Sequence, residues 1–274
     1  MLRASVLGSP IAHSLSPVLH RAGYAAAGLD GWEYEAHEVD AAGLAPFVAD
    51  LDDSWRGLSL TMPLKEAALA VAVAVSDVAT RAGAANTLVR RADGGWDATN
   101  TDVAGLVRAL RPFLADGARR ALVIGAGATA RSAVLALAEL GVTTLTVRAR
   151  DTAKAADLLA WALDLGVGVV NGSVADIAPW VTTRDDVVVS TVPASAGESV
   201  AATVPAAHAG VLLDVVYDGW PTPVARAAEA AGMIVVSGLD MLVHQAAEQF
   251  RLFTGHDAPV DAMAAAGRAA LGSR

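Results

Sequence analysis

Lys65 and Asp102 are residue types that can hold and move a proton, and both follow runs that are expected to be strands. Lys65 ends the segment Thr61-Met-Pro-Leu-Lys, where we expect a strand end, a turn and the first turn of a helix. If Lys65 faces a closed cleft, its amino group can donate and accept a proton. The simpler interpretations are a solvated surface lysine and, for Asp102, an N-cap or first-turn carboxylate of the following helix.

Hydroxyl and amide side chains occur at the other expected strand ends. Ser16 followed by Pro17 predicts an ordinary helix start in which Ser16 is the N-cap. That role leaves Ser14 unexplained, and the two hydroxyls together could bind a small anion such as a carboxylate. Asn86 taken alone is typical of a turn. Because ligands of open α/β sheets bind outside the carboxyl ends of strands, the recurrence of such polar ends indicates one ligand site.

A glycine-rich turn predicts a dinucleotide site. The apolar run Ala121–Ile124 leads into this turn, and a helical run to Leu140 follows it. The turn reads Gly125-Ala126-Gly127-Ala128-Thr129-Ala130. In this G-x-G-x-x-A pattern, Gly125 permits a tight turn and Gly127 lets backbone N–H groups approach a pyrophosphate. Ala130 keeps the helix close to the sheet.

The end of the next expected strand bears on which dinucleotide binds. At the place where an NAD site has an acidic residue, the sequence reads Val147-Arg-Ala-Arg-Asp-Thr-Ala-Lys154. Arg148, Arg150 and Lys154 suit the 2′-phosphate of NADP, because guanidinium and ammonium groups bind phosphate. Asp151 fits NAD better, and a solvated strand end with ordinary surface charges is the simpler interpretation. NADP is therefore favoured, with NAD as the alternative.

These residues need a framework, and the chain alternates short aliphatic runs with longer Ala/Leu-rich runs, as βαβ units with a mostly parallel sheet do. Asp93-Gly-Gly95 predicts a hairpin between Thr87–Arg90 and Trp96–Thr99. The other expected strands are Leu2–Leu7, Trp32–Val39, Gly57–Leu60, Ala121–Ile124, Thr143–Val147, Gly168–Val170, Val187–Val189, Val211–Val215 and Met233–Val236. The expected helices include Pro17–Ala27, Ala41–Leu51, Leu64–Val75, Gly238–Arg251 and Asp261–Leu271.

Composition and charge limit the class of protein. With 274 residues, of which 54% are hydrophobic and 18% charged, the chain can bury a large core, which excludes disorder. A net charge of −9 argues against nucleic-acid and anionic-membrane surfaces. The absence of cysteine excludes disulfides and thiolate chemistry, and the six histidines form no HxxxH or HExxH pair, so no metal site is expected. Neither a membrane span nor a signal peptide is apparent, which predicts a soluble cytoplasmic protein.

Seven segments in order along the chain resemble the shikimate dehydrogenase family: Gly8–Pro17, Leu60–Lys65, Gly83–Thr87, Asn100–Asp102, Gly125–Ala130, Asp214–Pro223 and Gly238–Gln245. The resemblance spans nearly the whole chain. It implies an oxidoreductase that reversibly reduces 3-dehydroshikimate to shikimate with NADPH, a step of chorismate and aromatic amino-acid biosynthesis. It implies a two-domain α/β protein, with an open, mostly parallel-sheet substrate domain at 1–103, completed by 239–274, and a Rossmann-type dinucleotide-binding domain at 104–238.

The resemblance also implies roles for individual residues. Lys65 would be the general acid/base, paired with Asp102. Substrate would be bound through its carboxylate by Ser14, Ser16 and Tyr217, and through its ring hydroxyls by Thr61, Asn86 and Gln245. NADP would be bound without a metal by Asp77, Gly125, Ala126, Gly127, Ala128, Thr129, Ala130, Ala149, Arg150, Lys154, Val215 and Gly238. The expected partner is the small-molecule substrate, with no nucleic acid or membrane, and the chain is expected to be a monomer or a homodimer.

The chain departs from the family pattern at two places. Ala149-Arg-Asp151 stands where the family commonly has Asn-Arg-Thr, and Ser59-Leu60 stands where many relatives carry Asn-Val. Two kinds of alternative follow. One is a quinate/shikimate or aminoshikimate dehydrogenase that uses NAD, and the other is a non-catalytic dinucleotide or metabolite sensor on the same scaffold. The presence of both Lys65 and Asp102 favours an enzyme, because a sensor does not need the pair.

Overall fold

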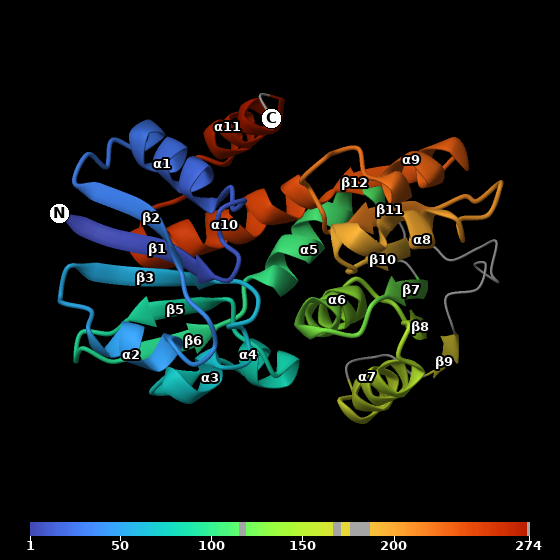
Figure 1. Cartoon of the computed structure of the whole chain (residues 1–274), viewed down its shortest axis with the longest axis horizontal. Coiled ribbons are helices and arrows are strands. Elements are labelled where there is room, and N and C mark those ends of the chain that lie inside the picture. Colours follow the sequence, from blue (N-terminus) through green and yellow to red (C-terminus); the bar gives the residue numbers. More distant parts are fainter. Residues whose placement is uncertain (115–118, 167–170, 176–186, 273–274) are drawn as a thin grey trace. The chain divides into compact units, whose positions relative to one another are not determined.

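A computed structural model describes the chain except for residues 115–118, 167–170, 176–186 and 273–274. The chain forms two compact units, each built on its own six-stranded sheet (Figure 1). Unit 1 consists of Met1–Gly105 and Leu242–Arg274, and unit 2 consists of Leu106–Met241. The chain passes from one unit to the other within two helices, α5 (Asp102–Leu110) and α10 (Gly238–Thr254).

In unit 1 the strand order is β2-β1-β3-β5-β6-β4. The strands are β1 (Leu2–Gly8), β2 (Trp32–Glu38), β3 (Trp55–Leu60), β4 (Ala74–Val75), β5 (Thr87–Arg90) and β6 (Trp96–Thr99). Strand β1 is parallel to β2 and β3, β5 is antiparallel to β3 and β6, and β4 is parallel to β6. As a result β1, β3 and β6 finish, and β5 begins, at one end of the sheet. We call this the polar end, because Ser14, Lys65, Asn86 and Asp102 lie in the segments next to these strand ends.

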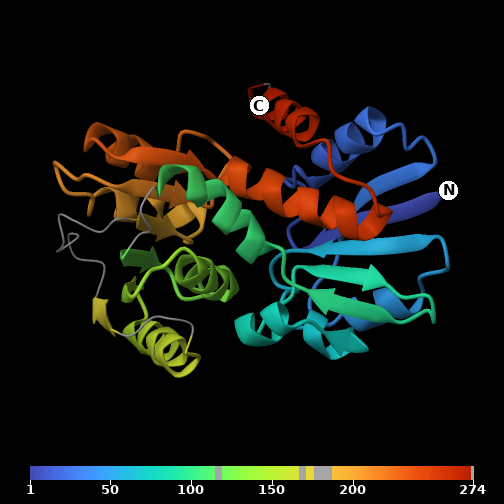
Figure 2. The ribbon, with the colours of Figure 1, turned by 180° about the vertical axis from the view of Figure 1, so that it is seen from behind.

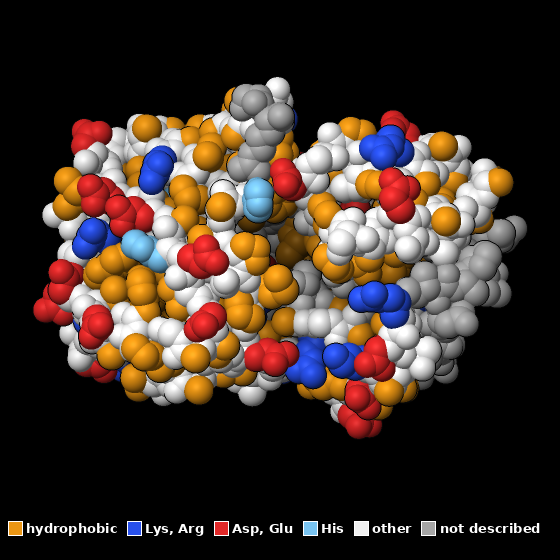
Figure 3. Space-filling view, in the orientation of Figure 1, with side chains coloured by type: hydrophobic (Ala, Val, Ile, Leu, Met, Phe, Trp, Pro, Cys, Tyr) orange, Lys and Arg blue, Asp and Glu red, His pale blue; other side chains and the backbone are white. Residues whose placement is uncertain are grey.

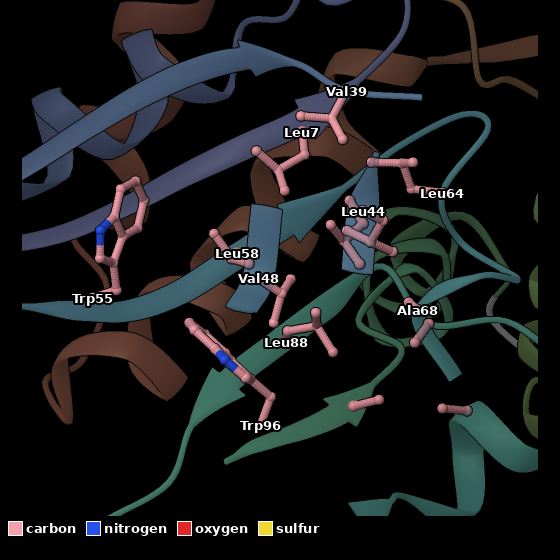
Figure 4. Packing of buried hydrophobic residues seen from close by; sticks show 14 residues of the cluster. Leu7, Val39, Leu44, Val48, Trp55, Leu58, Leu64, Ala68, Leu88 and Trp96 are labelled. Atoms are coloured by element: carbon pink, nitrogen blue, oxygen red, sulfur yellow. The ribbon is translucent and has the colours of Figure 1, made fainter. Parts of the chain in front are cut away.

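Helices cover both faces of the unit 1 sheet (Figures 1 and 2). One face carries α1 (Ser16–Ala26), the C-terminal part of α10 and α11 (Val260–Gly272), and the other carries α2 (Leu44–Ala49), α3 (Ala68–Val71) and α4 (Asp77–Ala82). Under α2 and α3, Leu58 and Leu88 of neighbouring strands are fully buried in the cluster drawn in Figure 4. Under α1 and α10, Tyr34, Phe250 and Phe253 form a second core. Burial on both faces fixes the sheet firmly enough to position its loops.

Unit 2 contains six parallel strands in the order β12-β11-β10-β7-β8-β9. They are β7 (Arg120–Ile124), β8 (Thr144–Arg148), β9 (Asn171–Ala175), β10 (Val187–Ser190), β11 (Val211–Asp214) and β12 (Ile234–Ser237). The α-helices between them are α6 (Ala128–Glu139), α7 (Thr152–Asp164), α8 (Gly197–Ala201) and α9 (Pro223–Ala230). This is the doubly wound strand order of dinucleotide-binding folds, whose direction reverses between β7 and β10. A ligand of such a sheet binds at this reversal, outside the carboxyl ends of the strands.

The predicted α/β class and the hairpin of β5 and β6 are confirmed, and most predicted strands and helices form with small shifts at their ends. The predicted helix Leu64–Val75 is wrong: only Ala68–Val71 is helical, and Ala74–Val75 pairs with β6. Alanine favours helix in this run, but the exposed edge of β6 offers the backbone sheet hydrogen bonds instead. The predicted strand Gly168–Val170 lies outside the described residues.

Two details of the predicted loops are also wrong. Ser16 is the first residue of α1 and not its N-cap, which is Leu15. The Ser14 hydroxyl accepts a hydrogen bond from the Ser16 N–H at 3.3 Å, so Ser14 satisfies one of the free N–H groups of this helix. Lys65 lies in the turn that precedes α3 and not in the first helical turn, because α3 begins only at Ala68.

Among the described residues, none of the helices combines the length and the apolarity that crossing a bilayer requires. Figure 3 shows Asp and Glu side chains distributed over the described surface of both units on the face drawn, in accord with the net charge of −9.

Candidate active site

Lys65 and Asp102 form an ion pair at the polar end of unit 1, with 2.6 Å between Lys65 Nζ and Asp102 Oδ2. Lys65 follows β3 and Asp102 is the first residue of α5 after β6. Both strands border β5, which brings their ends together. The side chains are 14% and 5% exposed, so the pair is screened less by solvent than a surface ion pair, and the carboxylate is almost entirely withdrawn from water. The ammonium group keeps some access to solvent, which a proton donor to a bound ligand needs.

Asn86 fixes the other half of the carboxylate. Its Nδ2 donates to Asp102 Oδ1 at 2.7 Å and to Gln245 Oε1 at 3.2 Å. Its Oδ1 accepts from the Thr101 N–H at 2.8 Å, and the Asp102 N–H donates to Asn100 Oδ1 at 3.0 Å. Asn86 is therefore not simply a turn residue. Both oxygens of Asp102 have a donor, which holds the carboxylate in one orientation toward Lys65.

Ser14, Ser16 and Thr61 lie at the same polar end, after β1 and β3. Ser14 and Thr61 are half-buried, and Ser16 is buried. The Thr61 N–H donates to the Leu7 carbonyl at 2.9 Å, and a Cβ at Gly8 would come within 2.4 Å of Thr61 Cγ2. The ends of β1 and β3 are therefore in direct contact. The three hydroxyls share the end of the sheet that carries the ion pair.

Two further residues predicted for substrate and cofactor, Tyr217 and Asp77, follow β11 and β4. Tyr217 belongs to unit 2, where it is half-buried in the segment after β11. Asp77 is the first residue of α4 in unit 1, with its side chain 87% exposed and 3.8 Å from Arg81. Among the described residues, no group of three His, Asp or Glu side chains has the arrangement of a metal site.

In unit 2 the glycine-rich turn joins β7 to α6, as predicted. Gly125 has φ +114°, and a Cβ there would come within 2.3 Å of Thr191 Oγ1, so both the backbone and its neighbour require glycine. A Cβ at Gly127 would meet nothing within 4 Å, which leaves open space before the N-terminus of α6. Ala128 and Thr129 form the first turn of that helix, and Ala130 is buried against the sheet. The turn therefore places open space in front of the positive end of a helix.

A cavity of about 740 Å³ lies at the reversal point of the unit 2 sheet. The loops after β7, β8 and β10 form its walls, including Gly125, Ala126, Gly127, Ala149, Arg150, Asp151, Lys154, Thr191, Ser195 and Ser199. Its volume falls in the range of cofactor sites. Asp151 Oδ1 accepts from the N–H groups of Ala153 and Lys154, both at 3.1 Å, so this carboxylate caps α7. Arg150 and Lys154 supply positive charge to the same wall.

Val215 and Gly238 lie together where α10 begins. A Cβ at Gly238 would come within 2.2 Å of the Val215 carbonyl oxygen, so glycine is needed for this close approach. Next to them, Asp214 is buried and accepts from Thr222 Oγ1 at 2.6 Å and from the Val216 N–H at 3.3 Å. Burial raises the pKa of the Asp214 carboxyl.

Comparison with known proteins identifies the family. Residues 6–88 match the model of the shikimate dehydrogenase substrate binding domain, and residues 238–266 match that of the shikimate 5'-dehydrogenase C-terminal domain. The shikimate dehydrogenase (NADP(+)) of Caulobacter vibrioides is 40% identical over 258 residues, which cover 91% of this chain and 88% of the relative. The chain belongs to the shikimate dehydrogenase family.

Solved structures of the shikimate dehydrogenase family extend this likeness to the whole fold. The enzyme from Mycobacterium tuberculosis is 46% identical, with a TM-score of 0.85, and the match covers 98% of this chain and 100% of that one. The enzyme from Thermus thermophilus, in complex with NADP(H) and shikimate, is 33% identical, with a TM-score of 0.85 and coverage of 99% and 100%. A quinate dehydrogenase from Corynebacterium glutamicum, in complex with NAD, is 30% identical, with a TM-score of 0.86 and coverage of 98% and 99%.

The sequence did not indicate two polar residues, Thr101 and Gln249, that contact Asn86 or its neighbour Thr87. Thr101 Oγ1 lies 3.0 Å from Asn86 Nδ2, and Gln249 Nε2 donates to Thr87 Oγ1 at 2.9 Å. Gln245 and Gln249 are four residues apart, on one face of α10. Gln249 could have been noticed because it is a polar residue on the apolar face of the helix, one turn after the predicted ligand residue Gln245.

The family departure at Ser59 also has a structural explanation. Ser59 is 3% exposed, accepts from the Tyr34 hydroxyl at 2.6 Å and donates to Gln249 Oε1 at 2.8 Å. A serine here therefore satisfies two buried polar side chains from other elements, β2 and α10.

Proposed function

We propose that the chain catalyses the reversible reduction of 3-dehydroshikimate to shikimate with NADPH, in the biosynthesis of chorismate and the aromatic amino acids. The observation that carries the proposal is the Lys65–Asp102 pair, 2.6 Å apart, with the second carboxylate oxygen bound by Asn86. Membership of the family supports the assignment of shikimate as substrate, and the glycine-rich turn with its cavity supports the assignment of NADP as cofactor.

Reduction of a ketone needs a hydride at carbon and a proton at oxygen. NADPH, when bound, supplies the hydride. The Lys65 ammonium group donates a hydrogen bond to the ketone oxygen, stabilises the negative charge that develops there and transfers its proton. In the oxidation of shikimate, the neutral amine accepts the hydroxyl proton. Asp102 orients Lys65 throughout, because its carboxylate is itself fixed by Asn86.

Substrate recognition in this proposal uses polar side chains of the polar end of unit 1 together with Tyr217 of unit 2. Asn86, Gln245 and Thr61 bind the ring hydroxyls, and Ser14, Ser16 and Tyr217 bind the carboxylate. Hydroxyl and amide groups suit a polyhydroxylated acid, because an analogue that lacks a hydroxyl leaves a buried partner unpaired.

The residues of unit 2 fit a dinucleotide. The open space before α6 suits a pyrophosphate, because the helix N-terminus attracts negative charge there. Arg150 and Lys154 suit a 2′-phosphate. An acidic residue at this place would bind the ribose 2′-hydroxyl of NAD, but the Asp151 carboxylate already accepts the N–H groups that cap α7. The remaining cofactor residues of the proposal are Asp77, Ala149, Val215 and Gly238.

The role of Lys65 is tested with Lys65→Ala. We expect kcat for shikimate oxidation to fall by about 10²–10⁴-fold, with a much smaller change in KM, because the side chain acts on the proton that moves in the transition state. Thermal melting of the variant establishes that it is folded. Turnover within a few-fold of wild type would remove Lys65 from the chemistry.

The substrate and cofactor are tested by steady-state oxidation of shikimate and quinate, each with NADP and with NAD. We expect the highest kcat/KM for shikimate with NADP. The likeness to a quinate dehydrogenase in complex with NAD supports the second candidate, a quinate/shikimate dehydrogenase that uses NAD, and quinate with NAD would then be preferred. Nucleotide binding without turnover of either acid would favour a sensor. We further propose that the protein is cytoplasmic. We also propose that it is a monomer or a homodimer, and light scattering would measure this oligomeric state.

A further inference from the structure

Gln249 is a buried amide of α10, 1% exposed, with every part of its side-chain amide engaged in unit 1. Its Nε2 donates to Thr87 Oγ1 at 2.9 Å and to the Asn86 carbonyl oxygen at 3.1 Å. Its Oε1 accepts from Ser59 Oγ at 2.8 Å. Gln249 lies one helical turn beyond Gln245, between the helix and the sheet, and its contacts are with β3 and with the segment that begins β5. It therefore contacts the main chain of Asn86 and the neighbouring Thr87 hydroxyl, and not the ion pair itself.

The chemistry of its members allows only one assignment of donors and acceptors in this network. A carboxylate only accepts hydrogen bonds, so Asn86 must turn its Nδ2 toward Asp102 and its Oδ1 away from it. Asn86 Oδ1 then accepts from Thr87 Oγ1 at 2.8 Å. With its one proton committed, the Thr87 hydroxyl accepts from Gln249 Nε2. The opposite orientation of the Gln249 amide would place a second acceptor in front of Thr87.

Two main-chain contacts select the same orientations independently. The Thr101 N–H donates to Asn86 Oδ1 at 2.8 Å. The Asn86 main-chain carbonyl cannot donate, and it accepts from Gln249 Nε2 as well as from the Leu60 N–H. At the far end, the Tyr34 hydroxyl donates to Ser59 Oγ at 2.6 Å, and the Ser59 hydroxyl in turn donates a hydrogen bond to Gln249 Oε1. Every donor has an acceptor, which makes the network rigid.

We infer that Gln249 is a positioning residue of the proposed reaction, which fixes the Asn86 amide and through it the orientation of the Asp102 carboxylate toward Lys65. The inference rests on the proposed function for its effect on turnover. It rests on the hydrogen bonds alone for its effect on the Asn86 side chain.

The direct test is Gln249→Met, which keeps the length of the side chain and removes both donors. Thr87 and Asn86 then lose their shared partner, and the Thr87 hydroxyl is no longer made to direct its proton to Asn86 Oδ1, so one of the bonds that hold the Asn86 amide is weakened. We expect kcat for shikimate oxidation to fall about tenfold or more, because a small misplacement of a positioning group is costly. The KM for NADP is expected to stay within about twofold, because no residue of the unit 2 cavity changes.

The matched control is Tyr34→Phe, which removes one buried hydrogen bond from the same network on the other side of Gln249. Gln249 keeps its bonds to Thr87 and Asn86 in this variant. We expect a loss of melting temperature similar to that of Gln249→Met, with kcat within about twofold of wild type. A purely structural role of Gln249 would instead lower kcat in both variants in proportion to the loss of stability.

Gln249→Glu gives a readout that depends on protonation. A protonated carboxyl can donate to Thr87 and accept from Ser59, whereas an ionised carboxyl can only accept. The titratable groups around this position are His20 on α1 and Tyr34 on β2. Burial lowers the pKa of His20 to about 3 and raises that of Tyr34, so both stay neutral near pH 7. We expect kcat of Gln249→Glu relative to wild type to fall as the pH rises.

The side-chain amide protons of Asn86, followed by NMR hydrogen exchange, provide a measurement independent of turnover. We expect faster exchange in Gln249→Met and unchanged exchange in Tyr34→Phe. The inference would be overturned if Gln249→Met left the exchange of the Asn86 protons unchanged. It would also be overturned if wild type oxidised shikimate and Gln249→Met did so with the same kcat. A wild type that oxidises no acid, but whose Asn86 exchange responds as expected, would overturn the proposed function and leave the positioning of Asn86 by Gln249 supported.

Discussion

The two oxygens of Asp102 are each bound by a different donor, Lys65 on one side and Asn86 on the other. A carboxylate held in this way cannot rotate, so it is Asp102 that fixes the position of the Lys65 ammonium group. The buried ion pair thus trades stability for orientation, since removing a charge from water costs several kcal/mol before its partner is counted. This is the balance expected of a group used for chemistry.

A prediction at the scale of the residue concerns the choice of nucleotide. Arg150 lies in the wall of the unit 2 cavity, next to the cap of α7. Loss of a charge-assisted bond to a phosphate costs about 1.5–3 kcal/mol, so we expect Arg150→Ala to raise the KM for NADP by about 10- to 100-fold. The KM for NAD should not change. Arg268→Ala on α11 is the control, and an equal effect of Arg150→Ala on both nucleotides would contradict the assignment.

Residue types and their places at strand ends made Lys65, Asp102 and Asn86 candidates, and the resemblance to the family assigned their expected roles. Gln249 was not predictable in the same way. Its partners Ser59 and Thr87 are far from it in the sequence, and a glutamine on a helix is usually a surface residue. Only the packing of α10 on the sheet makes it a partner of β3 and β5.

At the scale of the element, α10 is positioned by an aromatic ring that lies against bare backbone. Phe253 packs over Gly57 of β3, where a Cβ would come within 2.0 Å of the ring. The ring is almost fully buried. The small residue in the strand therefore sets how closely the helix that carries Gln245 and Gln249 approaches the sheet.

We expect Gly57→Ala to lower the free energy of unfolding by about 1–3 kcal/mol, because the ring and the helix must move to admit a methyl group. Chemical denaturation measures the loss. Gly31→Ala is the control, since a Cβ there meets nothing within 4 Å. In a Phe253→Ala background the same Gly57→Ala change should cost almost nothing. Equal costs in both backgrounds would show that the ring is not the cause.

The elements that the sequence predicted well are those with a local signal. The Asp93-Gly-Gly95 turn located the hairpin, and alternating aliphatic and Ala/Leu-rich runs located most strands. The run from Leu64 to Val75 failed, because helix propensity is a local quantity and the pairing of Ala74–Val75 with β6 is not.

At the scale of the whole molecule, the strand order of each sheet was beyond the reach of local patterns. In unit 2, β7 lies between β8 and β10, which places the glycine-rich turn at the reversal point. That neighbourhood depends on pairing between segments far apart in sequence. The alternation of strands and helices predicts a parallel sheet, but the cavity beside the turn follows only from the order of its strands.

The acid stability of the molecule depends on His20. Its ring is fully buried and stacks on Tyr34, with 4.1 Å between ring centroids. Burial lowers its pKa from 6.5 to about 3, so between these values the unfolded chain binds a proton that the folded chain does not. Stability therefore falls as the pH is lowered through this range, by up to about 1.4 kcal/mol per pH unit.

We expect His20→Phe, which keeps a stacked ring, to lose less unfolding free energy on acidification than wild type does. Denaturation curves between pH 7 and about pH 4 measure the difference. The other titrating groups are common to both proteins and cancel in the comparison. Parallel pH dependences would mean that His20 titrates normally in the folded state.

Unit 1 is assembled from two separate stretches of the chain, since Leu242–Arg274 returns to the sheet formed by Met1–Gly105. During synthesis on the ribosome the strands of this sheet emerge before unit 2, whereas Gln245, Gln249 and Phe253 emerge after it. Until then the backbone at Gly57 lies bare and Asn86 lacks two of its amide neighbours. Unit 2, which lies between these two stretches in the sequence, can therefore fold before both parts of unit 1 have been synthesised.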